Sequence, residues 1–149
     1  MRYAISAGVL VVRRGSVLLV RHRGSGFDFW VPPGGRLEGA ESILACAARE
    51  AFEETGLRVV PERIAYVEEF VERDLHFCKF WTVAPDPGGA PTLAGLDPDE
   101  THVVDVRFIA RSEIASLTVF PRVLRDAFWS DAERGFPESR YLGLTPIEG

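Results

Sequence analysis

Residues 35–57 read GRLEGAESILACAAREAFEETGL, and the second half of this segment places Glu50, Glu53 and Glu54 within about one and a half helical turns. From Glu41 onward the residues are good helix formers, and a glycine such as Gly56 commonly follows the last turn of a helix. We therefore predict a helix over 41–55 that ends at Gly56.

The three glutamates of this helix share one side of a helical wheel drawn at about 100° per residue. The opposite side carries the residues that we expect to be buried, namely Leu44, Ala48, Ala51, Phe52 and Thr55. Carboxylates three and four residues apart repel by a few tenths of a kcal/mol per pair, and the negative end of the helix dipole adds roughly 0.3 to 1 kcal/mol. One explanation for such a cluster of carboxylates is that the whole face of the helix is exposed to solvent.

A divalent cation is the other explanation, because clusters of oxygen ligands are what Mg²⁺ or Mn²⁺ binds. We therefore expect Mg²⁺ (or Mn²⁺) at the glutamates. Arg49 lies one turn from Glu53 and is placed to hold its carboxylate by a paired hydrogen bond.

The composition limits the class of protein. With 149 residues and 46% hydrophobic content, we predict one domain over 1–149, leaving the tail from about 132 to 149 unassigned. A net charge of -5 argues against a nucleic-acid polymer or an anionic membrane as partner. Arg13 and Arg14 interrupt the apolar N-terminal run before a membrane span is reached, so we expect a cytoplasmic protein. Cys46 and Cys78 are expected to be reduced core residues.

Alternating apolar patterns predict several strands around this helix. Residues 5–12 and 16–22 are expected to form a hairpin that turns at Arg14-Gly15, and a short strand covers 27–31. Residues 58–73, broken near Pro61, and 75–84 predict a second hairpin, and 102–109 a further strand. The segment 32–35, PPGG, is expected to leave any ladder, 85–100 to be a loop, and 112–131 to supply helical turns. Strands on both sides of a helix favour an α/β sandwich with a mixed sheet.

The spacing of the charged residues also carries a resemblance. Gly35, five residues, Glu41, seven residues and then 49–57, REAFEETGL, resemble the signature of the Nudix hydrolases at every fixed position. The preceding 30–35, WVPPGG, resembles the lead-in of that family, with Pro32 where an aliphatic residue is more usual. This resemblance implies an α/β/α sandwich with a mixed central sheet, extending from about residue 4 to 128.

The resemblance further implies metal-dependent hydrolysis of a nucleoside diphosphate linked to another group. Glu50 and Glu54 would be the principal metal ligands, Glu53 a ligand or the base for water, and the Gly34 carbonyl another ligand. Arg49 and Glu41 would orient them. Some members take the base from outside the motif. Glu100 is our preferred candidate, although it could equally belong to an ordinary, solvent-exposed acidic loop. The alternative residues are Asp97, Asp99, Glu68, Glu69 and Glu72.

Other residues are candidates for holding the substrate. Arg21 and Arg23 leave the second strand near a glycine-rich turn, where their forked donors would suit phosphate unless they are simply exposed cations. Aromatic side chains could stack on a base, although most are expected to be core: Phe27, Phe29, Trp30, Phe80 and Trp81. The three histidines lack metal-like spacing and are assigned no catalytic role.

The substrate is less well defined by the sequence. Residues 72–75 occupy the window where subfamilies carry a proline for ADP-ribose or a tyrosine for dinucleoside polyphosphates, and neither is present. This favours a nucleoside triphosphate or a similar small nucleotide. A catalytically silent nucleotide-binding domain and an interaction module using loop 85–100 are the alternatives, but the complete carboxylate set favours an enzyme. A homodimer is compatible with the family.

Overall fold

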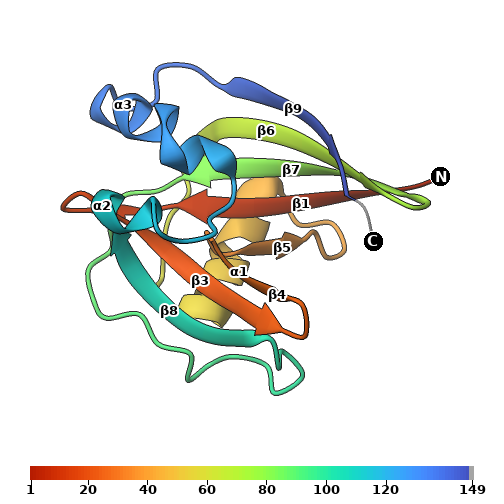
Figure 1. Cartoon of the computed structure of the whole chain (residues 1–149), viewed down its shortest axis with the longest axis horizontal. Helices are drawn as coiled ribbons and strands as arrows, with labels where there is room; N and C mark the ends of the chain where they lie inside the picture. Colours follow the sequence, from red (N-terminus) through yellow and green to blue (C-terminus); the bar gives the residue numbers. More distant parts are fainter. Residues whose placement is uncertain (148–149) are drawn as a thin grey trace.

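Residues 1–147, which the computed structural model describes, form two β-sheets with helices packed against them (Figure 1). The first sheet has the strand order β5-β1-β7-β6-β9, in which β1 pairs parallel with β7 and β6 parallel with β9. Its strands are β1 (Arg2–Leu10), β5 (Gly34–Arg36), β6 (Arg63–Glu72), β7 (Leu75–Val83) and β9 (Arg140–Pro146). The predicted α/β fold with a mixed sheet is confirmed.

The second sheet is antiparallel and centred on β3, which pairs with the other three strands. Its strands are β2 (Val12–Arg13), β3 (Ser16–Gly24), β4 (Phe27–Val31) and β8 (Val103–Ala110). The described residues contain no helix that is long and apolar enough to cross a membrane.

Helix α1 (Ile43–Thr55) begins two residues later than predicted and ends as predicted. Ser42 is still extended, and its hydroxyl accepts a hydrogen bond from the Ala45 N–H at 3.1 Å, which caps the first turn. At the other end Gly56 has a φ of 73°, a left-handed conformation that glycine adopts without strain.

The predicted orientation of this helix is wrong by roughly a quarter turn. Its buried residues are Cys46, Ala47, Ala51, Glu54 and Thr55. Phe52, expected in the core, is 43% exposed and lies beneath the guanidinium of Arg58, 4.3 Å from the ring centroid. Glu54, expected on the outer side, is only 8% exposed. The positions of the apolar residues in the helix could not predict that Glu54 is buried, because its hydrogen-bond partner lies outside the helix.

Two cores hold the layers together. One packs α1 against Val9 and Val11 at the β1 end and Leu18 and Val20 of β3. The other packs the C-terminal helices against Leu10, Trp30 and Trp81. Those helices are α2 (Arg111–Ile114), the 3₁₀ helix η1 (Arg122–Arg125) and α3 (Ala127–Glu133), so 112–131 supplies helical turns in short pieces. Figure 1 shows α2 and α3 on the opposite side of the sheets from α1.

The first predicted hairpin is correct only at its tip. Two residue pairs join β2 to β3 around a turn at Arg14 and Gly15, whose φ angles are 48° and 78°. Strand β1 instead leaves for the other sheet, between β5 and β7. It carries buried residues on both faces, Val9 in one core and Leu10 in the other, and such a strand needs a central position.

The expectation that 32–35 leaves the sheet is also wrong in part. The two prolines lie outside a strand, but Gly34 pairs with Gly8 and Gly35 with Ala7. The pairing continues the ladder by which the Pro33 carbonyl accepts a hydrogen bond from the Val9 N–H at 3.0 Å. This short antiparallel pairing fixes the loop that leads into α1.

The second half of the chain follows the prediction more closely. The β6–β7 hairpin turns at Arg73, which has a φ of 53°, and β6 begins after Pro61. Cys46 and Cys78 are both free, with Cys46 buried and Cys78 partly buried. The unassigned tail contributes β9 along β6, while residues 148 and 149 lie outside the described part.

Candidate active site

Glu54 connects α1 to the loop that precedes the helix, by which we mean residues 32–36, including the short strand β5. Its Oε1 accepts a hydrogen bond from the Gly34 N–H at 2.8 Å. Burial raises the pKa of Glu54 to about 8, and the charges of Glu50 and Glu100 add to the increase, while the Gly34 hydrogen bond and Lys79 oppose it. The structure therefore holds a largely buried carboxyl group against Gly34.

Glu50 lies one turn earlier and contacts the same loop. A Cβ placed on Gly35 would stand 2.5 Å from the Glu50 carboxyl carbon, so any larger residue here would displace this carboxylate from its position. Burial raises the pKa of Glu50 although Arg49 opposes the shift. Glu50 and Glu54 thus converge on Gly34 and Gly35.

Arg49, in the middle of α1, binds carboxylates that precede the helix and that lie in its second half. Its Nη2 and Nε donate to the two Glu41 oxygens at 2.7 and 3.1 Å, and its Nη1 donates to Glu50 at 3.0 Å and to Glu53 at 3.3 Å. The guanidinium lowers the pKa of Glu41 to about 2, helped by the Glu38 N–H. The principal partner of Arg49 is therefore Glu41, and the Glu53 side chain, 48% exposed, is held more loosely.

The donor set suits a cation that needs few protein ligands. No three His, Cys, Asp or Glu side chains within 1–147 are grouped closely enough to enclose a metal ion. Mg²⁺ usually keeps several waters and takes one or two carboxylates together with substrate phosphates. Glu50 and Glu54 meet that requirement. Both are carboxylates whose charged form burial disfavours, and a cation would offset this cost.

Lys79 of β7 is a site residue that the sequence reasoning missed. The ammonium lies 4.6 Å from the ring centroid of Trp81 and so close to Gly34 that a Cβ there would stand 2.7 Å from Nζ. Burial lowers the pKa of Lys79, and the charges of Glu54, Glu50 and Glu68 oppose that decrease. The one feature of the sequence that distinguished this residue is that it is the only lysine.

The acidic residues outside the motif differ in their relation to Glu54. Glu100 is exposed in a turn, and its charge contributes to the raised pKa of Glu54. Asp97 and Asp99 stabilise that turn, since the Asp97 side chain accepts the Asp99 N–H at 2.9 Å. Glu100 is therefore within electrostatic reach of the carboxylate pair.

The glutamates of β6 are differently placed. Glu68 accepts the Trp81 indole N–H at 2.8 Å, and burial raises its pKa. Glu69 is bonded instead to His76 at 2.7 Å and to the Tyr141 hydroxyl at 2.9 Å. Glu72 ends β6 at the hairpin. Of these three, only Glu68 interacts with Lys79.

The two arginines predicted to hold phosphate differ from each other. Arg21 donates from Nε and Nη2 to Asp28 at 2.8 and 2.7 Å, so two of its donors are engaged. Arg23 is exposed and forms no ion pair within 4.0 Å in the described part of the chain. Arg23 therefore keeps its donors free, and Arg21 is fixed beside Trp30.

The expectation that most of the aromatic candidates are core is wrong, since only Trp30 and Trp81 of the five lie in a core. Trp30 and Trp81 are 3% and 2% exposed, and Phe80 is partly buried. Phe27 is 39% exposed and lies 6.1 Å from Phe29, centroid to centroid. Phe29 stacks on His22 at 5.2 Å, and burial lowers the pKa of His22, with a smaller contribution from the charge of Lys79.

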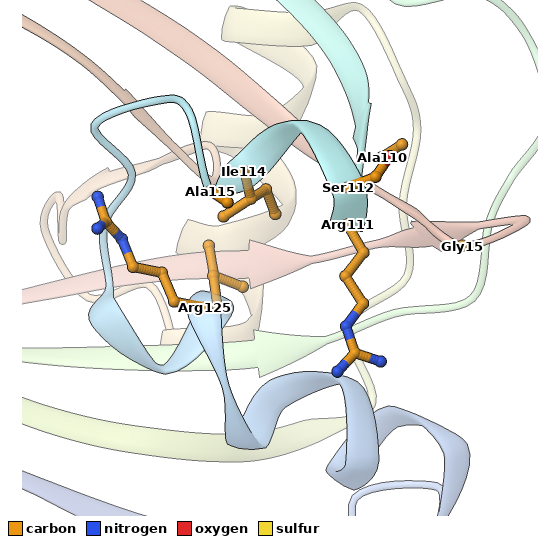
Figure 2. Close-up of a pocket in the computed structure, with 8 residues that line it drawn as sticks. Gly15, Ala110, Arg111, Ser112, Ile114, Ala115 and Arg125 are labelled. Carbon is orange, nitrogen blue, oxygen red and sulfur yellow. The ribbon is translucent and has the colours of Figure 1, made fainter.

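A cavity of about 740 Å³ lies elsewhere, between the turn at Gly15, helix α2 and η1 (Figure 2). Figure 2 shows the side chains of Arg111 and Arg125 extending in different directions, and Arg125 donates to the Leu117 carbonyl at 2.9 Å. No carboxylate lines the cavity. The cavity therefore offers arginine donors but no carboxylate ligand for a metal ion, in contrast to the loop and helix around Glu54.

Comparison with known proteins places this geometry in a family. Residues 2–128 match the model of the NUDIX domain. The chain is 30% identical over 114 residues to the phosphatase NudJ of Escherichia coli, covering 74% of this chain and 70% of the relative.

Two solved structures share the fold. The MutT protein of Methanosarcina mazei Go1 is 23% identical, with a TM-score of 0.69 over 92% of this chain and 97% of that one. The E. coli ORF135 protein is 17% identical, with a TM-score of 0.72 over 93% and 96% of the two chains. From the match over residues 2–128 and the similarity to NudJ, the chain belongs to the NUDIX domain family of hydrolases.

Proposed function

We propose that this protein is a metal-dependent pyrophosphohydrolase that cleaves the pyrophosphate linkage of a small nucleotide, most simply a nucleoside triphosphate. The observation that carries the proposal is the convergence of Glu50 and buried Glu54 on Gly34 and Gly35, with the Lys79 ammonium of β7 against Gly34. A carboxylate pair with one buried member, Glu54, and one partly buried member, Glu50, costs folding free energy unless a cation offsets it. The arrangement is therefore explained by a site for a cation and a phosphate chain.

Each residue of the site has an assigned part in this proposal. Glu50 and Glu54, with the Gly34 carbonyl, would hold Mg²⁺ or Mn²⁺, which when bound neutralises phosphate oxygens and lowers the pKa of a water. Arg49 keeps Glu50 and Glu53 in place through its own bond to Glu41.

The proton of the attacking water would pass to a carboxylate of the chain. Glu53 is one acceptor, since it is exposed next to Arg49, and Glu100 is the other, since it acts on Glu54 from outside the motif. Substitution of each by glutamine separates them, because the residue that serves as the base should account for the larger loss of kcat.

The nucleoside would lie toward the second sheet. Phe27 is 39% exposed and lies 6.1 Å from Phe29, centroid to centroid, and base stacking on such side chains is sequence-tolerant. Arg23, with its donors free, would contact the phosphates, and Arg21 would stay paired with Asp28. The relative NudJ is named a phosphatase, which agrees with a phosphate-containing substrate.

The test is release of phosphate or pyrophosphate from nucleoside triphosphates, sugar nucleotides, ADP-ribose and dinucleoside polyphosphates, with Mg²⁺ or Mn²⁺ and with chelator. Glu54→Gln should lower turnover of the preferred nucleotide by at least about 100-fold, while exposed Glu62→Gln serves as a matched control with no change. A folded wild-type protein that binds nucleotide and metal but turns over nothing would replace this proposal by a nonhydrolytic nucleotide-binding domain.

A further inference from the structure

Lys79 has a place in the site that the proposed roles leave unexplained. Of the 17 lysine and arginine residues of the chain, it is the only lysine. It stands directly opposite Glu68 in the β6–β7 pair, and its ammonium lies against Gly34. Gly34 is also the residue whose N–H holds Glu54. Lys79 therefore brings positive charge to the loop contacted by both carboxylates.

The ammonium remains available to a ligand. Lys79 forms no ion pair within 4.0 Å among residues 1–147, and its side chain is half-buried. The ring of Trp81 lies on one side of it, at 4.6 Å from Nζ to the centroid. A lysine ammonium has three N–H donors. The face of an aromatic ring attracts the ammonium but does not accept an ordinary hydrogen bond from it. The donors can therefore reach an oxygen of a bound molecule.

The choice of lysine over arginine has a physical reason. An arginine next to carboxylates tends to form a bidentate pair, as Arg49 does with Glu41. A lysine acts as a point charge on a flexible stem and is a common binder of phosphate. Glu50, Glu54 and Glu68 interact with Lys79 only at longer range. The site thus keeps one cation that its carboxylates have not captured.

A positive charge at this position opposes a divalent cation and favours a phosphate. It repels Mg²⁺ or Mn²⁺ from Glu50 and Glu54 when no substrate is present. When a pyrophosphate arrives with the metal, its negative charge attracts both cations. Removal of the ammonium should therefore strengthen binding of metal alone and weaken binding of pyrophosphate with metal.

We propose that Lys79 binds a nonbridging oxygen of the substrate pyrophosphate and makes metal binding depend on substrate binding. The inference rests on the proposed function and adds a phosphate-binding residue from outside the motif. A lysine that served only to neutralise Glu68 or to pack on Trp81 would not change the two affinities in opposite directions.

Calorimetric titration with two probes tests this role. The first probe is Mn²⁺ alone, and the second is imidodiphosphate, a pyrophosphate analogue with a nitrogen bridge, at saturating Mn²⁺. Lys79→Met should bind Mn²⁺ several-fold more tightly and imidodiphosphate about tenfold more weakly than the wild type. Lys79→Arg should recover only part of the second affinity, because its guanidinium can pair with the neighbouring carboxylates. Arg2→Met, which removes a charge paired with Asp74 at the other end of β7, should change neither.

The outcomes separate the two proposals. If Lys79→Met binds imidodiphosphate as well as the wild type, or if both affinities change in the same direction, the role of Lys79 is overturned and the proposed function stands. If the wild type itself does not bind imidodiphosphate with Mn²⁺, the role of Lys79 is overturned, and turnover of the nucleotide panel decides the proposed function separately.

A second measurement uses the wild type alone and does not depend on the folding of a variant. Apart from the N-terminal amine, Lys79 carries the only amine of the chain, so acetylation followed by mass spectrometry reports it directly. Imidodiphosphate with Mn²⁺ should slow acetylation of Lys79 by about tenfold and leave the N-terminal amine unchanged, because a bound phosphate covers the ammonium. Equal rates with and without the analogue would contradict the contact.

Discussion

Glu54 accepts a hydrogen bond from the Gly34 N–H across 20 residues of sequence, at 2.8 Å. This contact turns one face of α1 toward the preceding loop and buries a carboxylate that the helical wheel placed outside. It also brings Glu50 against Gly35, so both carboxylates meet the loop. The position of the loop therefore decides which glutamates are available to a cation.

Gly35→Ala should lower activity while leaving the fold intact. The new methyl group would stand 2.5 Å from the Glu50 carboxyl, and the end of that side chain can move away at little cost to folding. We expect kcat/KM to fall by at least about tenfold, with a change in Tm below about 3 °C. Gly95→Ala is the matched control, since a Cβ there has no neighbour within 4 Å. Equal activity of both variants would argue against Glu50 as a ligand.

Arg49→Lys should show that geometry, in addition to charge, is needed at this position. The guanidinium donates to both Glu41 oxygens and to Glu50, and an ammonium cannot reproduce this set of bonds. We expect kcat/KM to fall by about tenfold or more, and a double-mutant cycle with Glu41→Gln to be strongly non-additive. If the two losses simply added, Arg49 would act independently of Glu41.

The carboxylate of Asp131 should be important for stability. It is 3% exposed and accepts hydrogen bonds from the Tyr66 hydroxyl at 2.6 Å and from Arg140 at 2.9 and 3.1 Å, so it joins α3, β6 and β9. Tyr66→Phe should lower the free energy of unfolding by about 1 kcal/mol, because one bond to a buried charge is lost. Asp131→Ala should lower it by about 2 to 4 kcal/mol, because it leaves the Tyr66 hydroxyl unpaired.

Urea unfolding checks both values. Tyr141→Phe is the control, since it removes a hydroxyl bond to Glu69 on an exposed side chain and should cost less than about 0.5 kcal/mol. If Tyr66→Phe and Tyr141→Phe lowered the free energy of unfolding by similar amounts, burial of the Tyr66–Asp131 hydrogen bond would make no additional contribution to stability.

The Arg13–Asp86 pair should make stability depend on pH in acid. Arg13 donates to both Asp86 oxygens, at 2.7 and 2.8 Å, and this hydrogen bonding lowers the pKa of Asp86 to about 2. The unfolded chain then binds more protons than the folded one between the two pKa values, so stability falls as the pH falls through this range. The stabilisation is fully present above the ordinary aspartate pKa and is lost toward pH 2.

Asp86→Asn should therefore reduce stability at pH 7 and have progressively less effect below about pH 4. Chemical denaturation from pH 7 to pH 3 measures the difference between variant and wild type. Asp74→Asn, whose partner Arg2 is exposed, should show a smaller effect throughout. If the difference in stability between Asp86→Asn and the wild type stayed constant down to pH 3, the charge of Asp86 would not be the source of its stabilising effect.

The sequence determined the local features of the site. Helical propensity over 41–55 and the left-handed preference of Gly56 set the end of α1, and fixed spacing put Glu50 and Glu54 one turn apart. The apolar patterns of 58–73 and 75–84 predicted the β6–β7 hairpin. These features depend on neighbours within a few residues, which is why the pattern of residues is enough to predict them. The expected homodimer and cytoplasmic location stay predictions.

Only the tertiary structure decided how α1 is turned and what it meets. Which face of the helix is buried depends on the backbone N–H of Gly34 and on the free space at Gly35. A helical wheel includes neither, because both residues lie outside the helix. Lys79 reaches the same loop because β7 lies beside β1, which pairs with β5, and these strands are distant in sequence. The tail became β9 because β6 offered a free edge. Burial and hydrogen bonding between distant segments, which local propensity cannot encode, set these positions.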